Sequence, residues 1–137
     1  MNRIFLDTGY LIALEASDDQ HHLTAYQHWQ QLKKNKPVLV TTSYVFDEVT
    51  TFFNSRNRHS KAVEIGNRLL QSPSIIFIHV DEYLFEAGWK TFRIHKDKRY
   101  SLTDCISFEV MEREGIQQVL SFDTHFEQAG FHRMPEA

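Results

Sequence analysis

Cysteine, proline and long apolar runs are scarce in this chain. With a single cysteine, Cys105, no internal disulfide can form, and a reducing, cytoplasmic setting is expected. No stretch approaches the roughly 20 apolar residues of a membrane span. The N-terminus reaches an acid, Asp7, after only a short apolar run, which excludes a signal peptide. These absences predict a cytoplasmic protein that forms one domain, residues 1–137, without a membrane partner.

The chain nevertheless has the composition of a folded domain. Apolar residues make up 42% and aromatic residues 13%, with eleven phenylalanines among them. The formal net charge of −3 argues against a sequence-independent binder of nucleic acid. It does not exclude a nuclease, because acids that face cations and local basic patches matter more than the total charge.

Short apolar runs alternate with longer amphipathic stretches along the chain. The pattern predicts strands at 3–6, 38–40, 75–78, 119–122 and near 131–134. It predicts helices at 9–14, 18–34, 43–57, 60–70, 81–93 and 101–115, and a short helix after residue 122. Apolar strands separated by helices indicate an α/β fold, a central parallel sheet of four to five strands in an α/β/α sandwich. Ligands of such sheets bind at the carboxyl ends of the strands.

Four acids fall near that edge of the predicted sheet. Asp7 directly follows the first strand, and Glu48 lies about two turns into the helix after the second. Asp104 lies in the first turn of the helix that Ser101 opens, and Asp123 directly follows the strand at 119–122. We therefore expect these four carboxylates to converge.

Clustered carboxylates repel one another when they are ionised, and a hard divalent cation removes that cost. Mg²⁺ and Mn²⁺ prefer oxygen ligands, and such ions can activate a water for attack on a phosphodiester. The four acids therefore predict a Mg²⁺ or Mn²⁺ site with hydrolytic chemistry.

Each acid also has a purely structural interpretation. Asp7 and Asp123 could cap the helices that follow them, and Asp104 stands at the capping-box spacing from Ser101. Glu48 could be a solvated helix residue. A cap and a metal ligand are compatible roles, and the placement of all four at one edge favours the functional interpretation.

Other catalytic classes fit less well. The run Asp7-Thr8-Gly9 is typical of aspartic proteases, but those are β-rich and a helix is predicted here. Gly9 also stands where an Asp-x-Asp phosphatase needs its second acid. His21 and His22 cannot both face one metal from a regular helix, so no zinc site is predicted.

The acids lie in runs that resemble the motifs of PIN domains. The opening Phe5–Leu14 and the following Asp18–Ala25 are similar to the start of that family. Thr42–Val49 resembles the second motif, with its acid at Glu48 rather than at the neighbouring aspartate. Ser101–Cys105 and Ser121–Phe126 resemble the third and the last. The resemblance covers nearly the whole chain, in the expected order.

This resemblance implies a PIN-like fold and a metal-dependent endoribonuclease. It implies Asp7, Glu48 and Asp104 as the principal metal-site and catalytic acids, and Asp123 as the one that completes the site. It further implies Thr8 and Thr103 as supporting polar residues. Many small members are toxins of type II toxin–antitoxin pairs, so the expected partners are RNA, a cognate antitoxin and a second copy in a homodimer. The alternative is a catalytically silent PIN-fold module that binds RNA or protein.

A basic stretch precedes Asp104. Lys96, Lys98 and Arg99 are candidates for contact with the RNA backbone, and Tyr100 is a candidate for stacking on a base. A solvated loop is the competing interpretation. His125 close to Asp123 could likewise approach substrate or simply lie on the surface of a short helix, and Cys105 is expected to be a buried small residue.

Overall fold

In the computed structural model, which describes residues 2–136, five strands form a single sheet. The strands are β1 (Arg3–Leu6), β2 (Val38–Thr42), β3 (Ile75–Ile78), β4 (Gln118–Leu120) and β5 (His132–Met134). Their order across the sheet is β3-β2-β1-β4-β5, and each neighbouring pair is parallel. The predicted parallel sheet of four to five strands is confirmed.

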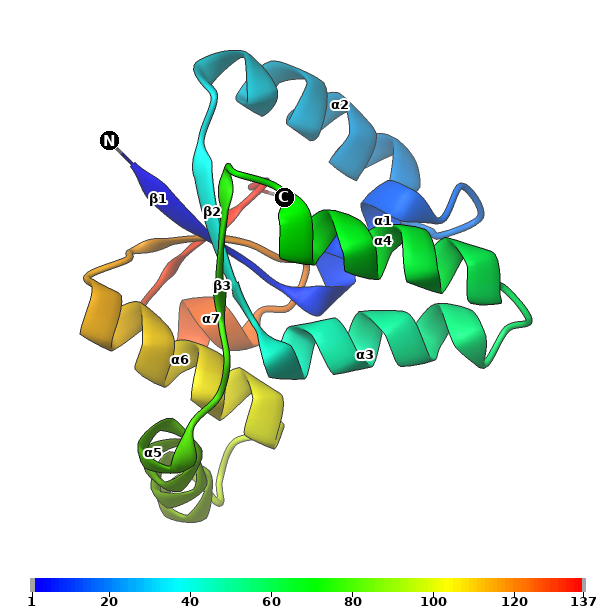
Figure 1. The fold of residues 1–137 in the computed structure, drawn as a ribbon. Helices are drawn as coiled ribbons and strands as arrows, with labels where there is room; N and C mark the ends of the chain where they lie inside the picture. The colour runs from blue at the N-terminus through cyan, green and yellow to red at the C-terminus, as the bar shows by residue number, and fades with distance from the viewer. Residues whose placement is uncertain (1, 137) are drawn as a thin grey trace.

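Helices cover both faces of this sheet. They are α1 (Thr8–Glu15), α2 (His22–Leu32), α3 (Ser43–Asn54), α4 (His59–Gln71), α5 (Glu82–Ile94), α6 (Leu102–Glu114) and α7 (His125–Gln128), with a 3-10 turn η1 (Lys33–Asn35). Figure 1 shows α1 to α4 on one side of the sheet and α5 to α7 on the other. This division follows from right-handed crossovers, because the chain runs outward from β1 to β3 and then returns to add β4 and β5 on the opposite side. None of the helices in residues 2–136 is long and apolar enough to cross a membrane.

The core lies between the sheet and the two helical layers. Phe5 of β1, Val40 of β2 and Val119 of β4 are fully buried at its centre. Helix α6 is buried over most of its length, because it packs on the sheet and is itself covered by α5. Cys105 on α6 is buried, as expected, and burial raises the pKa of its thiol to about 11.

The segment predicted as one helix over 18–34 forms a turn before it becomes helical. Helix α2 begins only at His22, because the side chain of Asp19 accepts a hydrogen bond of 2.9 Å from the backbone N–H of His21. Such an Asx contact offers the backbone an alternative to helical hydrogen bonding. At the other end, Lys36 has a left-handed φ of 48°, which stops the helical turn.

The second strand is longer than predicted and the helix after it is shorter. Strand β2 continues through Thr42, and the hydroxyl of Thr41 donates 2.9 Å to the carbonyl of Leu6 on the neighbouring strand. Thr42 also caps α3 by accepting from the backbone N–H of Val45 at 3.2 Å. Helix α3 ends at Asn54 rather than near Asn57, because Asn57 has a left-handed φ of 59°.

The fourth strand ends before the predicted Phe122. Strand β4 stops at Leu120, and the hydroxyl of Ser121 then accepts 2.9 Å from the backbone N–H of Asp123, which closes a turn. Asp123 therefore lies within a loop and does not directly follow the strand. Strand β3 is an edge strand, so it is not buried on both faces, and Ile76 is 40% exposed.

Candidate active site

The four predicted acids line one open cavity at the carboxyl edge of the sheet. Asp7 follows β1 and Asp123 lies in the loop after β4, so the cavity opens where the chain order across the sheet reverses. Glu48 reaches it from α3 and Asp104 from α6. The cavity has a volume of about 550 Å³ and is lined by Asp7, Thr8, Gly9, Glu48, Arg99, Ser101, Asp104, Phe122, Asp123, Thr124 and His125.

Asp7 is the most deeply buried of the four. Its Oδ2 accepts a 2.8 Å hydrogen bond from the hydroxyl of Ser121. The pKa of this carboxyl is raised to about 7, chiefly by burial and also by the negative charges of Asp104 and Asp123, against the hydrogen bond from the Ser121 hydroxyl, which lowers it. Asp7 stands at the N-cap position of α1 but makes no side-chain capping hydrogen bond. The hydrogen bond from Ser121 therefore joins Asp7 to the segment after β4.

Glu48 reaches the cavity next to Thr8. The hydroxyl of Thr8 donates 2.7 Å to Oε1 of Glu48, which joins α1 to α3 at the cavity wall. Glu48 is partly buried, whereas its neighbour Asp47 is exposed. The second supporting residue predicted from the sequence, Thr103, is buried but does not line the cavity; its carbonyl accepts from the hydroxyl of Ser107.

Asp104 combines the predicted cap with a place in the cavity. Its backbone N–H donates 2.9 Å to the hydroxyl of Ser101, and its Oδ2 accepts 3.0 Å from the backbone N–H of Ser101, which is a complete capping box. The same Oδ2 lies 2.8 Å from Nδ1 of His125. The side chain of Asp104 therefore caps α6 and also lines the cavity.

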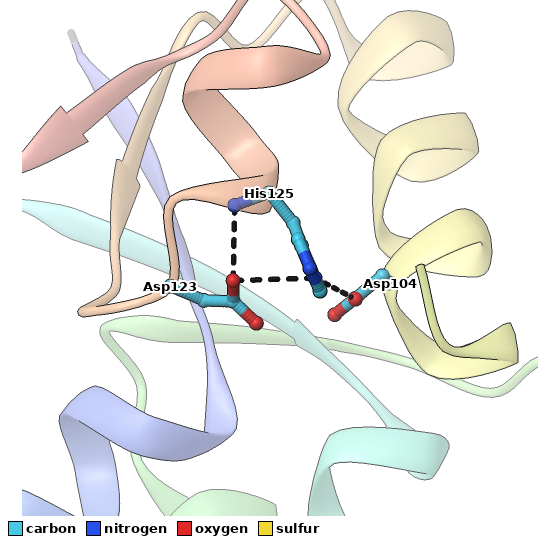
Figure 2. Close-up of side chains that lie close together, drawn as sticks. All are labelled: Asp104, Asp123 and His125. Atoms are coloured by element: carbon cyan, nitrogen blue, oxygen red, sulfur yellow. Dashed lines mark hydrogen bonds and ion pairs between the residues drawn. The ribbon is translucent and has the colours of Figure 1, made fainter. Parts of the chain in front are cut away.

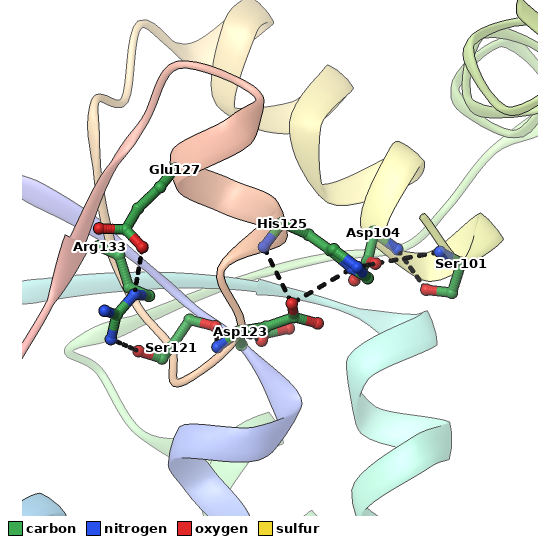
Figure 3. Close-up of polar contacts among 8 residues, drawn as sticks. Ser101, Asp104, Ser121, Asp123, His125, Glu127 and Arg133 are labelled. Carbon is green, nitrogen blue, oxygen red and sulfur yellow. Dashed lines mark hydrogen bonds and ion pairs between the residues drawn. The ribbon is translucent and has the colours of Figure 1, made fainter. Parts of the chain in front are cut away.

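Asp123 is fixed by the first residue of α7. Its Oδ1 accepts 2.9 Å from the backbone N–H of His125 and lies 3.2 Å from Nδ1 of the same residue (Figure 2). The loop that carries Asp123 is held in turn from β5. Figure 3 shows Arg133 between Glu127 and Ser121, with Nε 3.1 Å from Oε1 of Glu127 and Nη1 3.5 Å from the carbonyl of Ser121.

A common pattern relates the four carboxylates. In each, one oxygen is held by a donor from the protein: Ser121 for Asp7, Thr8 for Glu48, Ser101 with His125 for Asp104, and His125 for Asp123. Within residues 2–136, the second oxygens of Glu48, Asp104 and Asp123 accept no hydrogen bond from the protein. These oxygens are available to a ligand in the cavity.

This donor set fits a hard divalent cation. The available ligands are carboxylate oxygens, which Mg²⁺ and Mn²⁺ prefer. Ligand atoms of Asp104, Asp123 and His125 lie within 4.8 Å of one another. Among the residues that the structure describes, Arg99 is the one lysine or arginine that lines the cavity, so the protein leaves much of the negative charge unbalanced.

Two residues of the site were not assigned from the sequence. Ser121 holds Asp7, and His125 contacts both Asp104 and Asp123. Both lie within the run Ser121–Phe126 that carries the last family motif, so the signal was the motif itself. The contact of Ser121 with Asp7 and that of His125 with Asp104 join residues 114 and 21 positions apart, which the motif does not reveal.

The basic stretch before α6 divides into two parts. Lys96 and Lys98 are exposed, and Arg99 lines the cavity beside the acids. The structure buries Tyr100, the candidate for stacking on a base, and leaves its residue only 7% exposed. Its ring packs edge-on against Phe108 at 5.0 Å between centroids, so it is part of the core beneath the cavity.

The chain is similar to known proteins in both sequence and fold. The family model described as "PIN domain" matches residues 4–132. The curated proteins called "23S rRNA-specific endonuclease VapC20", from two strains of Mycobacterium tuberculosis, are 36% identical over 93% of this chain and 95% of their own length. A crystal structure of Mycobacterium tuberculosis VapC20, described as a sarcin-ricin loop cleaving toxin, superposes with a TM-score of 0.84 at 35% identity, over 93% of this chain and 95% of that one.

Proposed function

The chain belongs to the PIN-domain family, and on that basis we propose that it is a metal-dependent endoribonuclease that acts in the cytoplasm as the toxin of a toxin–antitoxin pair. The observation that carries this proposal is the convergence of Asp7, Glu48, Asp104 and Asp123 from four separate elements in one cavity. A domain that only bound RNA would gain nothing from buried carboxylates that repel one another.

We assign Asp7, Glu48 and Asp104 as the principal ligands of Mg²⁺ or Mn²⁺, with Asp123 completing the set. A divalent cation bound there supplies an activated water and stabilises negative charge on the phosphodiester. The protein contributes orientation, because Ser121 and Thr8 hold the carboxylates of Asp7 and Glu48 before any ligand arrives.

The substrate backbone needs cationic contacts beside this acidic cavity. Arg99 lines the cavity, and the exposed Lys96 and Lys98 precede it in the same loop between α5 and α6. We propose that these three residues contact phosphates of the RNA and set its register, which is the usual role of lysine and arginine at nucleic-acid interfaces. The substrate strand would then enter from the α5–α6 loop toward Asp104.

The relatives indicate which RNA and which partners to test. VapC20 is described as specific for 23S rRNA and as cleaving the sarcin-ricin loop, and we propose the same stem-loop as substrate here. The toxin role implies a cognate antitoxin that blocks the cavity or its approach. We also propose that the chain acts as a homodimer.

The proposal is tested by cleavage of a sarcin-ricin stem-loop RNA, with an unrelated hairpin as specificity control. We expect cleavage in Mg²⁺ or Mn²⁺ and none in EDTA. Asp7→Asn and Asp104→Asn should cut about 100-fold more slowly or worse, because metal-assisted charge stabilisation contributes several kcal/mol and each 1.36 kcal/mol is about tenfold in rate. Asp47→Asn, at an exposed acid outside the cavity, is the matched control and should cut normally.

Two results would contradict the proposal. Equal cleavage by the parent, Asp7→Asn and Asp104→Asn would show that the site is wrongly assigned. RNA binding that survives EDTA without any cleavage would favour the catalytically silent binding module.

A further inference from the structure

His125 stands between two carboxylates that come from different elements. Its Nδ1 lies 2.8 Å from Oδ2 of Asp104 on α6 and 3.2 Å from Oδ1 of Asp123 in the β4–α7 loop (Figure 2). Both neighbours are carboxylate oxygens, and an ionised carboxylate can accept a hydrogen bond but cannot donate one. The proton in these contacts is therefore on Nδ1, which donates. One side chain of α7 thereby connects two acids that are 19 positions apart in the sequence.

The imidazole is itself held in place. The ring of Tyr100 packs edge-on against it at 5.4 Å between centroids, and Tyr100 is in turn buried against Phe108. The His125 side chain is only 21% exposed. The backbone N–H of His125 also bonds to Asp123, so the ring and the loop acid are tied together at two points.

His125 contacts one carboxylate oxygen of Asp104 and one of Asp123. Oδ2 of Asp104 takes donors from Ser101 and His125, and Oδ1 of Asp123 takes the backbone and ring donors of His125. The opposite oxygen of each acid accepts nothing from residues 2–136. The shared donor also lies between two negative charges and offsets their repulsion.

We propose that His125 is a positioning residue of the acidic site, which uses its Nδ1–H to fix Asp104 and Asp123 so that their remaining oxygens face one bound cation. The inference rests on the proposed function. A direct ligand role through Nδ1 is disfavoured, because that nitrogen already lies at hydrogen-bonding distance from Asp104. Outer contacts of this kind typically change metal affinity by 10–100-fold when they are removed.

The test separates the two ring nitrogens by substitution. In His125→Asn the amide nitrogen can take the place of Nδ1, whereas in His125→Gln it takes the place of Nε2; His125→Ala supplies neither. Mn²⁺ affinity is measured by calorimetry on the full chain without RNA, and the melting temperature of each variant confirms folding. His132→Ala is the matched control, because His132 lies on β5, away from the cavity, and contacts Glu136.

We expect His125→Ala and His125→Gln to bind Mn²⁺ about 10–100-fold more weakly than the parent. His125→Asn should stay within about threefold of the parent, and His132→Ala should be unchanged. If His125→Ala does not fold, the Mn²⁺ affinity of His125→Asn compared with that of His125→Gln still tests the inference.

Three results overturn the inference. Parent-like affinity in His125→Ala shows that the contact does not position the acids. Affinity in His125→Asn as weak as in His125→Gln shows that the imidazole nitrogen acts directly as a ligand, and rescue by glutamine alone assigns the role to Nε2. Failure of the parent to bind Mn²⁺ is a different outcome, since it removes the metal dependence of the proposed function itself.

Discussion

The carboxyl group of Asp7 lies at the end of the central strand β1, where burial raises its pKa to about 7. The hydrogen bond from Ser121 opposes this shift, and the charges of Asp104 and Asp123 add to it. In the metal-free protein the ionised form of Asp7 therefore destabilises the fold. A cation in the cavity would remove that cost. Ionised Asp7 therefore lowers the stability of the metal-free fold but would contribute to binding of the cation.

This leads to a prediction about pH. Between about pH 4 and pH 7 the folded protein holds a proton on Asp7 that the unfolded chain, near the ordinary pKa of 3.8, has released. The contribution of Asp7 to the free energy of unfolding thus falls as the pH rises through that window, by at most about 4 kcal/mol at 1.36 kcal/mol per pKa unit. Asp7→Asn has no carboxyl group at this position, so its unfolding free energy does not fall with pH for this reason. In EDTA, urea unfolding at pH 5 and pH 8 should show the stability of Asp7→Asn relative to the parent increasing with pH.

Asp47→Asn is the control for this measurement, because Asp47 is exposed. Its difference from the parent should stay nearly constant over the same range. A constant difference between the parent and Asp7→Asn would contradict the raised pKa of Asp7.

At the scale of elements, the position of Asp104 in the site depends on the packing of α6. It presents Asp104 in its first turn, and it is held against the sheet by α5. The two helices approach closely at Gly88, where a Cβ would collide with Cγ1 of the buried Ile106 and lie 3.2 Å from its Cα. Only glycine permits this close approach of the two helices. Gly88 is therefore required because it has no side chain, and not because of its conformational freedom.

Gly88→Ala should therefore destabilise the protein. Overpacking a buried contact costs about 1–3 kcal/mol, and it opposes the roughly 1 kcal/mol that alanine gains over glycine within a helix. Urea unfolding measures the balance. Gly9→Ala is the matched control, since a Cβ there meets nothing within 4 Å and should be neutral or stabilising. A Gly88→Ala variant as stable as Gly9→Ala would show that α5 and α6 can separate without cost.

At the scale of the whole molecule, the site exists only when both helical layers are assembled on the sheet. Glu48 comes from the layer of α1 to α4, whereas Asp104 comes from the layer of α5 to α7 (Figure 1). Asp7 and Asp123 come from the edge of the sheet between them. A cation that binds all of them binds the folded state and not the unfolded chain, so metal binding and global stability are linked.

Mg²⁺ or Mn²⁺ should accordingly raise the melting temperature. At a hundredfold excess over Kd the gain in unfolding free energy is about 2.7 kcal/mol. Asp104→Asn should show a much smaller gain in the same titration, and KCl at matched ionic strength controls for screening. A melting temperature that is indifferent to both divalent ions would count against convergence of the acids on one cation.

The alternation of apolar strands with helices was sufficient to predict the parallel sheet, because buried strands carry a local signal that does not depend on their neighbours. The position of Asp7 followed from the same pattern, since residues after parallel strands gather at one edge. Element ends were less accurate. The Asp19 contact that delays α2 and the left-handed Asn57 that ends α3 are local choices that compete with helical periodicity.

The sequence by itself thus determined the fold class and the four candidate acids. Only the tertiary structure decided that Tyr100 is buried, that Thr103 stays outside the cavity, and that Ser121 and His125 hold the acids. The physical reason is distance along the chain. Asp7 and Ser121 are 114 positions apart, and Asp104 and His125 are 21 positions apart, so their hydrogen bonds form only after the sheet and both helical layers have packed.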